Sequence, residues 1–99
     1  MATSQKLQAY SPQEIERKAR RIKGWDYDAK SGMLEREYLF PSFPTALHFV
    51  RYVGELAELA QHHPDIDVRY NRVRLALVTH DAGGVTDKDF DLIGQIDHR

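Results

Sequence analysis

The chain has 99 residues, 41% hydrophobic and 29% charged, with a formal net charge of −1, which fits one soluble globular domain and excludes a disordered chain. That charge gives no general attraction to nucleic acid or to a membrane surface. The absence of cysteine excludes disulfides and thiolate chemistry, and no apolar run approaches the ~20 residues of a membrane span. Residues 1–10 lack the apolar core of a secretion signal, so we expect a cytoplasmic protein with one domain over residues 1–99 and a loose N-terminal arm over residues 1–10.

The first predicted elements are a short helix and a hairpin. Ser11 can cap the helix, Glu14 can complete a capping box, and Gly24 is placed to end it. Residues 25–40 predict two strands around the turn-forming stretch 28–32. Before the turn, Trp25 and Tyr27 alternate with acids. After it, one set of side chains alternates with another, Glu35, Glu37 and Leu39 with Arg36, Tyr38 and Phe40.

The longest predicted helix starts near residues 42–45 and runs to about Gln61, where Pro64 prevents its continuation. Apolar residues recur along it at spacings of three and four, which is typical of a helix that packs one face against a core. These residues are Ala46, Phe49, Val50, Val53, Leu56, Ala57 and Ala60.

A second hairpin is predicted over residues 68–80, with a tight turn at Asn71-Arg72 and the side chains of Val73, Leu75 and Leu77 on one face. Thr86 then opens a last helix. The order α-β-β-α-β-β-α predicts an α+β fold of two layers, in which a four-stranded antiparallel sheet carries three helices on one face.

Two adjacent histidines, His62 and His63, end the longest helix directly before Pro64. Neighbouring helical residues point about 100° apart, so the two rings do not easily share a metal ion, but a bend at the helix end can turn both into one cleft. A helix C-terminus favours an imidazolium by roughly 0.3–1 kcal/mol, which suits a general acid. Histidine is also acceptable as an ordinary residue of a last helical turn, and these residues alone do not decide between the two interpretations.

Three more residues carry a functional and a structural interpretation side by side. Glu58 precedes His62 by four residues and can orient its ring, or it is a solvated surface glutamate. His80 ends an apolar strand, where it is either a functional loop residue or a partly exposed strand end. Asp89 lies three residues after Thr86 and either caps the last helix or supports a histidine.

The stretch AELAQHHPDIDVRYNRVRLALVTHDAGGVTDKDFDL resembles the pterin-4a-carbinolamine dehydratase family. The resemblance extends more weakly through the preceding helix to the hairpin that begins at Trp25. It implies an α+β fold with helices on one side of a four-stranded antiparallel sheet. It also implies loss of water from a 4a-hydroxytetrahydropterin, giving a quinonoid dihydropterin, in the recycling of the tetrahydropterin used by aromatic amino acid hydroxylases. The family needs neither a metal nor an organic cofactor. The residues that carry the resemblance are Glu58, His62, His63, Pro64, Thr79, His80, Asp81, Gly84 and Asp89.

The resemblance also implies roles for individual residues. Dehydration removes a proton from ring nitrogen N5 and protonates the hydroxyl that leaves C4a, and both tasks suit imidazoles. Ile66 stands where animal-type members carry a tryptophan, so it can line a pocket but cannot stack on the pterin ring. The implied site has His62, His63 and His80 as catalytic imidazoles, with Glu58, Pro64, Ile66 and Asp89 as substrate-binding or supporting residues.

Two other hypotheses compete with a dehydratase that binds a small pterin substrate. Some relatives of the family act as assembly factors or transcriptional coactivator partners, and the complete set of three histidines distinguishes this chain from a purely structural relative. A metal site built from Glu58, His62 and His80 is the other hypothesis, which the adjacent histidine pair disfavours. The family further implies a homodimer or homotetramer. From the net charge and the lack of a long apolar run, we expect no direct contact with nucleic acid and none with a membrane.

Overall fold

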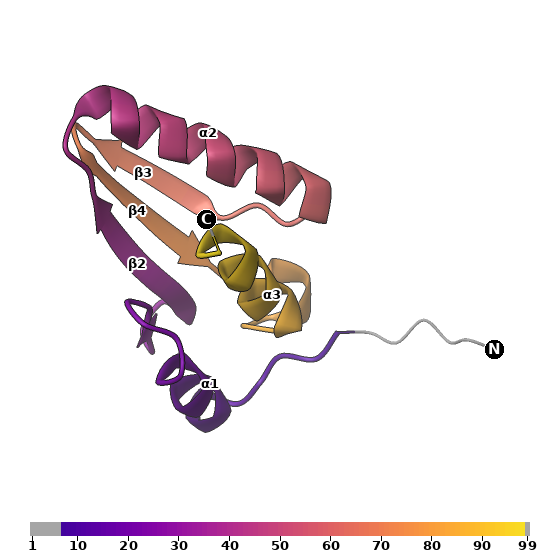
Figure 1. Ribbon diagram of the computed structural model, residues 1–99. Helices are drawn as coiled ribbons and strands as arrows, with labels where there is room; N and C mark the ends of the chain where they lie inside the picture. Colours follow the sequence, from indigo (N-terminus) through magenta and orange to yellow (C-terminus); the bar gives the residue numbers. More distant parts are fainter. Residues whose placement is uncertain (1–6, 99) are drawn as a thin grey trace.

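The computed structural model describes residues 7–98, and the predicted order of elements is confirmed (Figure 1). Residues 1–6, which make up most of the expected N-terminal arm, lie outside the described residues. A short 3-10 turn, η1 (His80–Ala82), is added between the last strand and the last helix. The main elements are α1 (Pro12–Ala19), β1 (Asp26–Asp28), β2 (Met33–Leu39), α2 (Phe43–Ala60), β3 (Asp65–Arg69), β4 (Arg72–Leu77) and α3 (Asp87–Ile96).

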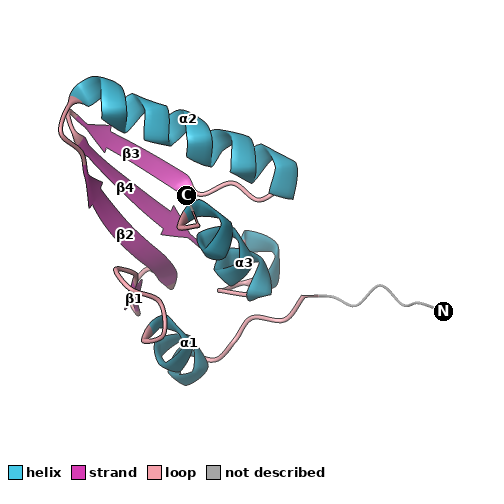
Figure 2. Ribbon diagram, in the orientation of Figure 1, coloured by secondary structure: helices cyan, strands magenta, loops and turns pink. Residues whose placement is uncertain are grey.

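The four strands form one antiparallel sheet in the order β1-β2-β4-β3, so the two hairpins meet between β2 and β4. As predicted, Val73, Leu75 and Leu77 share the buried face of the central strand β4. Figure 2 shows α2 running alongside β3 and β4, and α2 packs against α3 and β4. This confirms the α+β fold. Within the described part of the chain, no helix has the length and apolar character that a membrane span requires.

Each of the three helices begins with a capping box, in which the cap side chain and the third helical residue satisfy each other's backbone donors. The pairs are Ser11 with Glu14, Ser42 with Thr45, and Thr86 with Asp89. The first helix is shorter than predicted. From Arg21 on, the backbone N–H groups donate three residues back instead of four, so α1 has ended before Gly24 is reached.

The turn of the second hairpin lies at Tyr70-Asn71, and the prediction of Asn71-Arg72 is wrong by one residue. Arg69 pairs with Arg72 across it, and Tyr70 takes the left-handed backbone conformation, with φ +54°. Tertiary hydrogen bonds hold this turn in place of a glycine. The Phe40 backbone N–H donates to the Asn71 carbonyl, and the Asn71 side-chain amide donates to the Phe40 carbonyl, both at 2.9 Å.

Candidate functional site

The end of α2 determines where the histidine pair points. Gln61 takes a left-handed conformation, with φ +53° and ψ +42°, and the His62 backbone N–H donates back to the Ala57 carbonyl at 3.0 Å. This bend separates the two rings. The His62 side chain is 10% exposed, whereas that of His63 is 62% exposed. The local structure therefore gives adjacent residues of the same type two different environments.

The His62 ring is held by a buried carboxylate. Its Nε2 lies 2.6 Å from Asp89 Oδ1, and Asp89 is fully buried. Asp89 Oδ2 accepts from the Thr79 hydroxyl at 2.8 Å and from the Thr86 backbone N–H at 2.9 Å. Because an ionised carboxylate only accepts hydrogen bonds, His62 Nε2 carries the donated proton, which leaves Nδ1 as the acceptor of the neutral ring. Asp89 thus fulfils both sequence interpretations, as helix cap and as support for a histidine.

His63 takes the carboxylate that the sequence had suggested for His62. Its Nε2 lies 2.9 Å from Glu58 Oε2, and the two side chains are 62% and 68% exposed. The predicted pairing of Glu58 with His62 is wrong, because spacing on a continuous helix does not hold across the left-handed residue Gln61. An exposed pair of this kind stabilises a fold by at most about 1 kcal/mol. The main effect of Glu58 is therefore to orient the His63 ring.

The third histidine lies in a closed loop after the sheet. Strand β4 ends at Leu77, so the prediction that His80 ends the strand is wrong, and His80 begins the turn η1. Thr79 and Gly84 close this loop through two backbone hydrogen bonds, at 3.1 and 3.3 Å. Gly83 has φ +77°, a conformation that a glycine adopts without strain. The loop returns the chain to Thr86 and Asp89, which brings His80 close to the end of α2.

The three histidines line one cavity of about 250 Å³. Pro64 and Ile66 do not line it; Ile66 lies on β3, paired with Leu75. Glu58 and Asp89 contact the histidines from outside the lining. Sequence reasoning missed Asp81 and Lys88 as lining residues, although both are sequence neighbours of residues that it singled out. The complete lining is Gln61, His62, His63, Val78, Thr79, His80, Asp81 and Lys88.

The site does not present a metal-binding arrangement. Across residues 7–98, no group of three or more histidine, aspartate or glutamate side chains is placed to hold a metal ion. In particular, Glu58 contacts His63 rather than joining His62 and His80.

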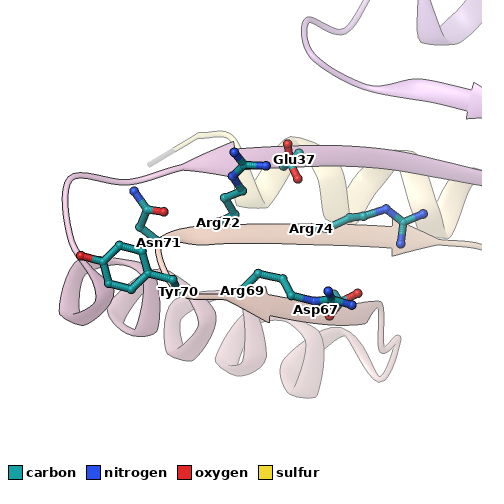
Figure 3. A pocket seen from close by; sticks show the side chains of 7 residues that line it. All are labelled: Glu37, Asp67, Arg69, Tyr70, Asn71, Arg72 and Arg74. Atoms are coloured by element: carbon teal, nitrogen blue, oxygen red, sulfur yellow. Dashed lines mark hydrogen bonds and ion pairs between the residues drawn. The ribbon is translucent and has the colours of Figure 1, made fainter.

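A larger hollow of about 750 Å³ lies elsewhere, over the open face of the sheet (Figure 3). Its side chains come from β2, β3, β4 and the turn at Tyr70-Asn71, and none is a histidine. Two of its arginines are ion-paired, Arg74 with Glu35 at 2.7 Å and Arg69 with Asp67 at 3.5 Å. This hollow lies at the start of β4, whereas the histidine cavity lies beyond the end of the same strand. We therefore interpret it as a solvated, charge-paired sheet face and take the histidine cavity as the candidate active site.

The fold and the cavity together define a small α+β protein in which three histidines line one cavity. The family model described as pterin 4 alpha carbinolamine dehydratase matches residues 8–99. The chain therefore belongs to the pterin-4-alpha-carbinolamine dehydratase family.

Individual relatives agree with this membership. A protein of Acidobacterium capsulatum, named "Putative pterin-4-alpha-carbinolamine dehydratase", is 53% identical over 88% of this chain and 92% of its own length. A relative of the same name from Chloroflexus aurantiacus is 56% identical over 73% of this chain and 77% of its own length. Among solved structures, a transcriptional coactivator/pterin dehydratase from Brucella melitensis has a TM-score of 0.85 at 29% identity, covering 91% of this chain and 96% of its own. A pterin dehydratase-like protein described as a RuBisCO assembly factor shares the fold alone, with a TM-score of 0.64 at 21% identity over 76% of this chain and 87% of its own.

Proposed function

We propose that this protein is a dehydratase that removes water from 4a-hydroxytetrahydropterin and releases the quinonoid dihydropterin, in the recycling of tetrahydropterin. The observation that carries the proposal is the convergence of His62, His63 and His80 on one cavity. Membership of the pterin-4-alpha-carbinolamine dehydratase family supports the choice of a pterin as substrate.

The reaction needs only proton transfers and the movement of one electron pair. A general base takes the proton from N5, the N5–H electrons form the N5=C4a double bond, and the C4a–O bond breaks. A general acid protonates the departing hydroxyl, which leaves as water, so no oxidant or reductant takes part. General acid and base catalysis contributes typically about 10²–10⁴-fold, and two imidazoles in one cavity can supply both.

The different environments of the three rings suggest different contributions. His63 and His80 are exposed and can exchange protons with water between turnovers, so we assign the two proton transfers to this pair. His62 is fixed by its contact with Asp89, so its other ring nitrogen has a defined position at the cavity wall. There it contacts the substrate and positions it for the two proton transfers. Glu58 orients the His63 ring from the solvent side.

A stopped-flow dehydration assay with synthetic 4a-hydroxytetrahydropterin tests these assignments. We expect His63→Ala and His80→Ala each to lower the catalysed rate by about 10²-fold or more, because each removes one general acid or base. His48→Ala is the matched control, since His48 is an exposed histidine of α2 outside the cavity lining. If both site variants kept the rate of the control, the assignment of proton transfer to these rings would be rejected.

A protein-binding role is a second candidate, because the Brucella melitensis neighbour is described as a transcriptional coactivator as well as a pterin dehydratase. The same variants separate the two roles. Dehydration depends on the imidazoles of His63 and His80, whereas a docking role on another surface survives their loss.

A further inference from the structure

The open face of the sheet carries charged side chains in rows that cross the strands, because residues paired across neighbouring strands point to the same side. One row consists of Asp67 on β3, Arg74 on β4 and Glu37 on β2. Its single cation lies between two carboxylates, and Arg74 also forms an ion pair with Glu35 at 2.7 Å. The charges of this row therefore satisfy one another within the sheet.

The next row, toward the turn between β3 and β4, has no such balance. It consists of Arg69 on β3, Arg72 on β4 and Leu39 on β2. Two guanidinium groups thus belong to directly opposite positions of the hairpin, where like charges destabilise a sheet. Arg69 has one exposed ion pair, with Asp67 at 3.5 Å, and Arg72 forms none with any residue in the range 7–98.

Arg69 and Arg72 line the hollow of about 750 Å³ together with Tyr70, and Figure 3 shows that the two arginine side chains diverge. Exposed apolar groups flank them, since Leu39 is 70% and Tyr70 is 71% exposed. The Tyr70 ring lies nearly parallel to that of Phe43, with centroids 6.5 Å apart. This end of the sheet therefore presents two neighbouring cations beside two exposed apolar side chains.

An acidic segment of a partner protein fits this combination. A guanidinium binds a carboxylate through two parallel hydrogen bonds, and carboxylates on both arginines would remove the repulsion between them. An apolar side chain next to the carboxylates would cover Leu39. A nucleic acid fits less well, because its phosphates would continue past the row to Asp67 and Glu37, which repel them.

We propose that the row of Arg69, Arg72 and Leu39 is a docking surface for an acidic segment of a partner protein. Carboxylates of the segment bind the two arginines, and an apolar side chain packs on Leu39. None of the three residues lines the histidine cavity, so the proposal goes beyond the dehydratase function and does not rest on it.

The first test titrates ¹⁵N-labelled protein at low ionic strength with a synthetic peptide whose centre is Glu-Ser-Glu-Ser-Leu. Alternate residues of an extended peptide point to the same side, so two glutamates and the leucine can face the row. We expect the backbone amide signals of Leu39, Arg69 and Arg72 to shift in the NMR spectrum. Arg69→Gln/Arg72→Gln should raise Kd about tenfold or more, because charge-assisted hydrogen bonds are lost. The control is Arg20→Gln/Arg21→Gln, which removes two exposed arginines just after α1, has the same net charge and should leave Kd unchanged.

A second test needs no peptide. Arg72→Gln should raise the urea midpoint of unfolding at low ionic strength, because it removes the like charge opposite Arg69. Arg74→Gln should lower the midpoint, because it leaves Asp67 and Glu37 without the cation between them. Both arginines are exposed, so neither change disturbs the core. Midpoints that move in the same direction would contradict the like-charge argument on which the proposal depends.

Four results of the titration would overturn the proposal. If the wild type shows no shift of the three signals, the surface does not bind an acidic segment. If a peptide with glutamine in place of glutamate binds equally well, the carboxylates are not recognised. If the two double variants have the same Kd, the peptide binds outside this row. If a ten-nucleotide polyuridine shifts the same signals with a lower Kd than the peptide, the surface is a nucleic-acid site.

Discussion

Within the described residues, the Asp89 carboxylate is the only one that is both fully buried and hydrogen-bonded to a histidine of the site. Its removal therefore tests how the His62 ring is held in place. In Asp89→Ala, the His62 Nε2–H and the Thr86 backbone N–H lose their acceptor in a buried place. The Thr79 and Thr86 hydroxyls lie 2.8 Å apart and still bond each other. Two unsatisfied groups at about 1–3 kcal/mol each predict a loss of about 2–6 kcal/mol in the free energy of unfolding.

Asp89→Asn probes the same contacts without removing the side chain. The Thr86 N–H is an obligatory donor, so the amide oxygen must take the place of Oδ2, and the amide NH₂ then faces His62 Nε2. Nε2 must therefore become an acceptor, and the proton of the neutral ring moves to Nδ1. We expect a smaller loss of stability than in Asp89→Ala, together with a changed His62 tautomer and a lower dehydration rate.

Urea unfolding measures the stabilities, and ¹⁵N NMR of the imidazoles reports the tautomer. Asp91→Ala is the matched control, because Asp91 is exposed on the same helix, and it should change the free energy of unfolding by no more than about 0.5 kcal/mol. A loss below about 1 kcal/mol in Asp89→Ala would refute the argument from buried hydrogen bonds. An unchanged His62 tautomer in Asp89→Asn would refute the argument that Asp89 sets the ring's protonation pattern.

Three further predictions concern exposed contacts and backbone conformation. Glu58→Gln should change the free energy of unfolding by less than about 1 kcal/mol in urea unfolding, because its histidine partner is exposed, and should lower kcat only a few-fold. The hydrogen bond to Asp87 raises the pKa of Tyr10 above its ordinary 10.0. The contribution of this hydrogen bond to the free energy of unfolding is therefore fully present below pH 10, and it is lost as the pH rises through the pKa of Tyr10 in the folded state. Tyr10→Phe should accordingly lower Tm at pH 7, with a difference that shrinks above pH 10. Gly24→Ala should lower the free energy of unfolding by about 1–2 kcal/mol, because φ is +87° and a Cβ would press on the Arg36 guanidinium. Gly94→Ala should raise it by up to about 1 kcal/mol, because Gly94 lies in α3 with no atom near the position of an added Cβ. Equal unfolding midpoints for the two glycine variants would contradict the last prediction.

The parts of the fold that follow local rules could be predicted from the sequence. Ser11 and Thr86 cap helices because their side chains and the acids three residues later are all that a capping box requires. The alternation from Val73 to Leu77 predicted the buried face of β4, since side-chain direction in a strand depends only on position. The convergence of His62 and His63 on one cavity also followed from a local possibility, the bend at a helix end.

What the sequence could not predict depends on contacts made after folding. The predicted partner of Glu58 was wrong because Gln61 adopts a left-handed conformation. Such a conformation is usually signalled in a sequence by glycine, and here the residue is glutamine. The turn at Tyr70-Asn71 shifted because hydrogen bonds to Phe40, 31 residues away from Asn71, hold it. Lys88 enters the cavity lining only through the packing of α3 beside the end of α2, which no local pattern specifies.

The central claim is that the protein catalyses loss of water from 4a-hydroxytetrahydropterin through its histidine cavity. Its most direct test is the observed rate constant of dehydration, followed by stopped-flow absorbance at increasing concentrations of wild-type protein and of the double variant His63→Ala/His80→Ala. The account predicts a rate constant that rises in proportion to wild-type concentration and stays near the buffer value for the double variant. A rate constant that is independent of wild-type concentration would contradict it.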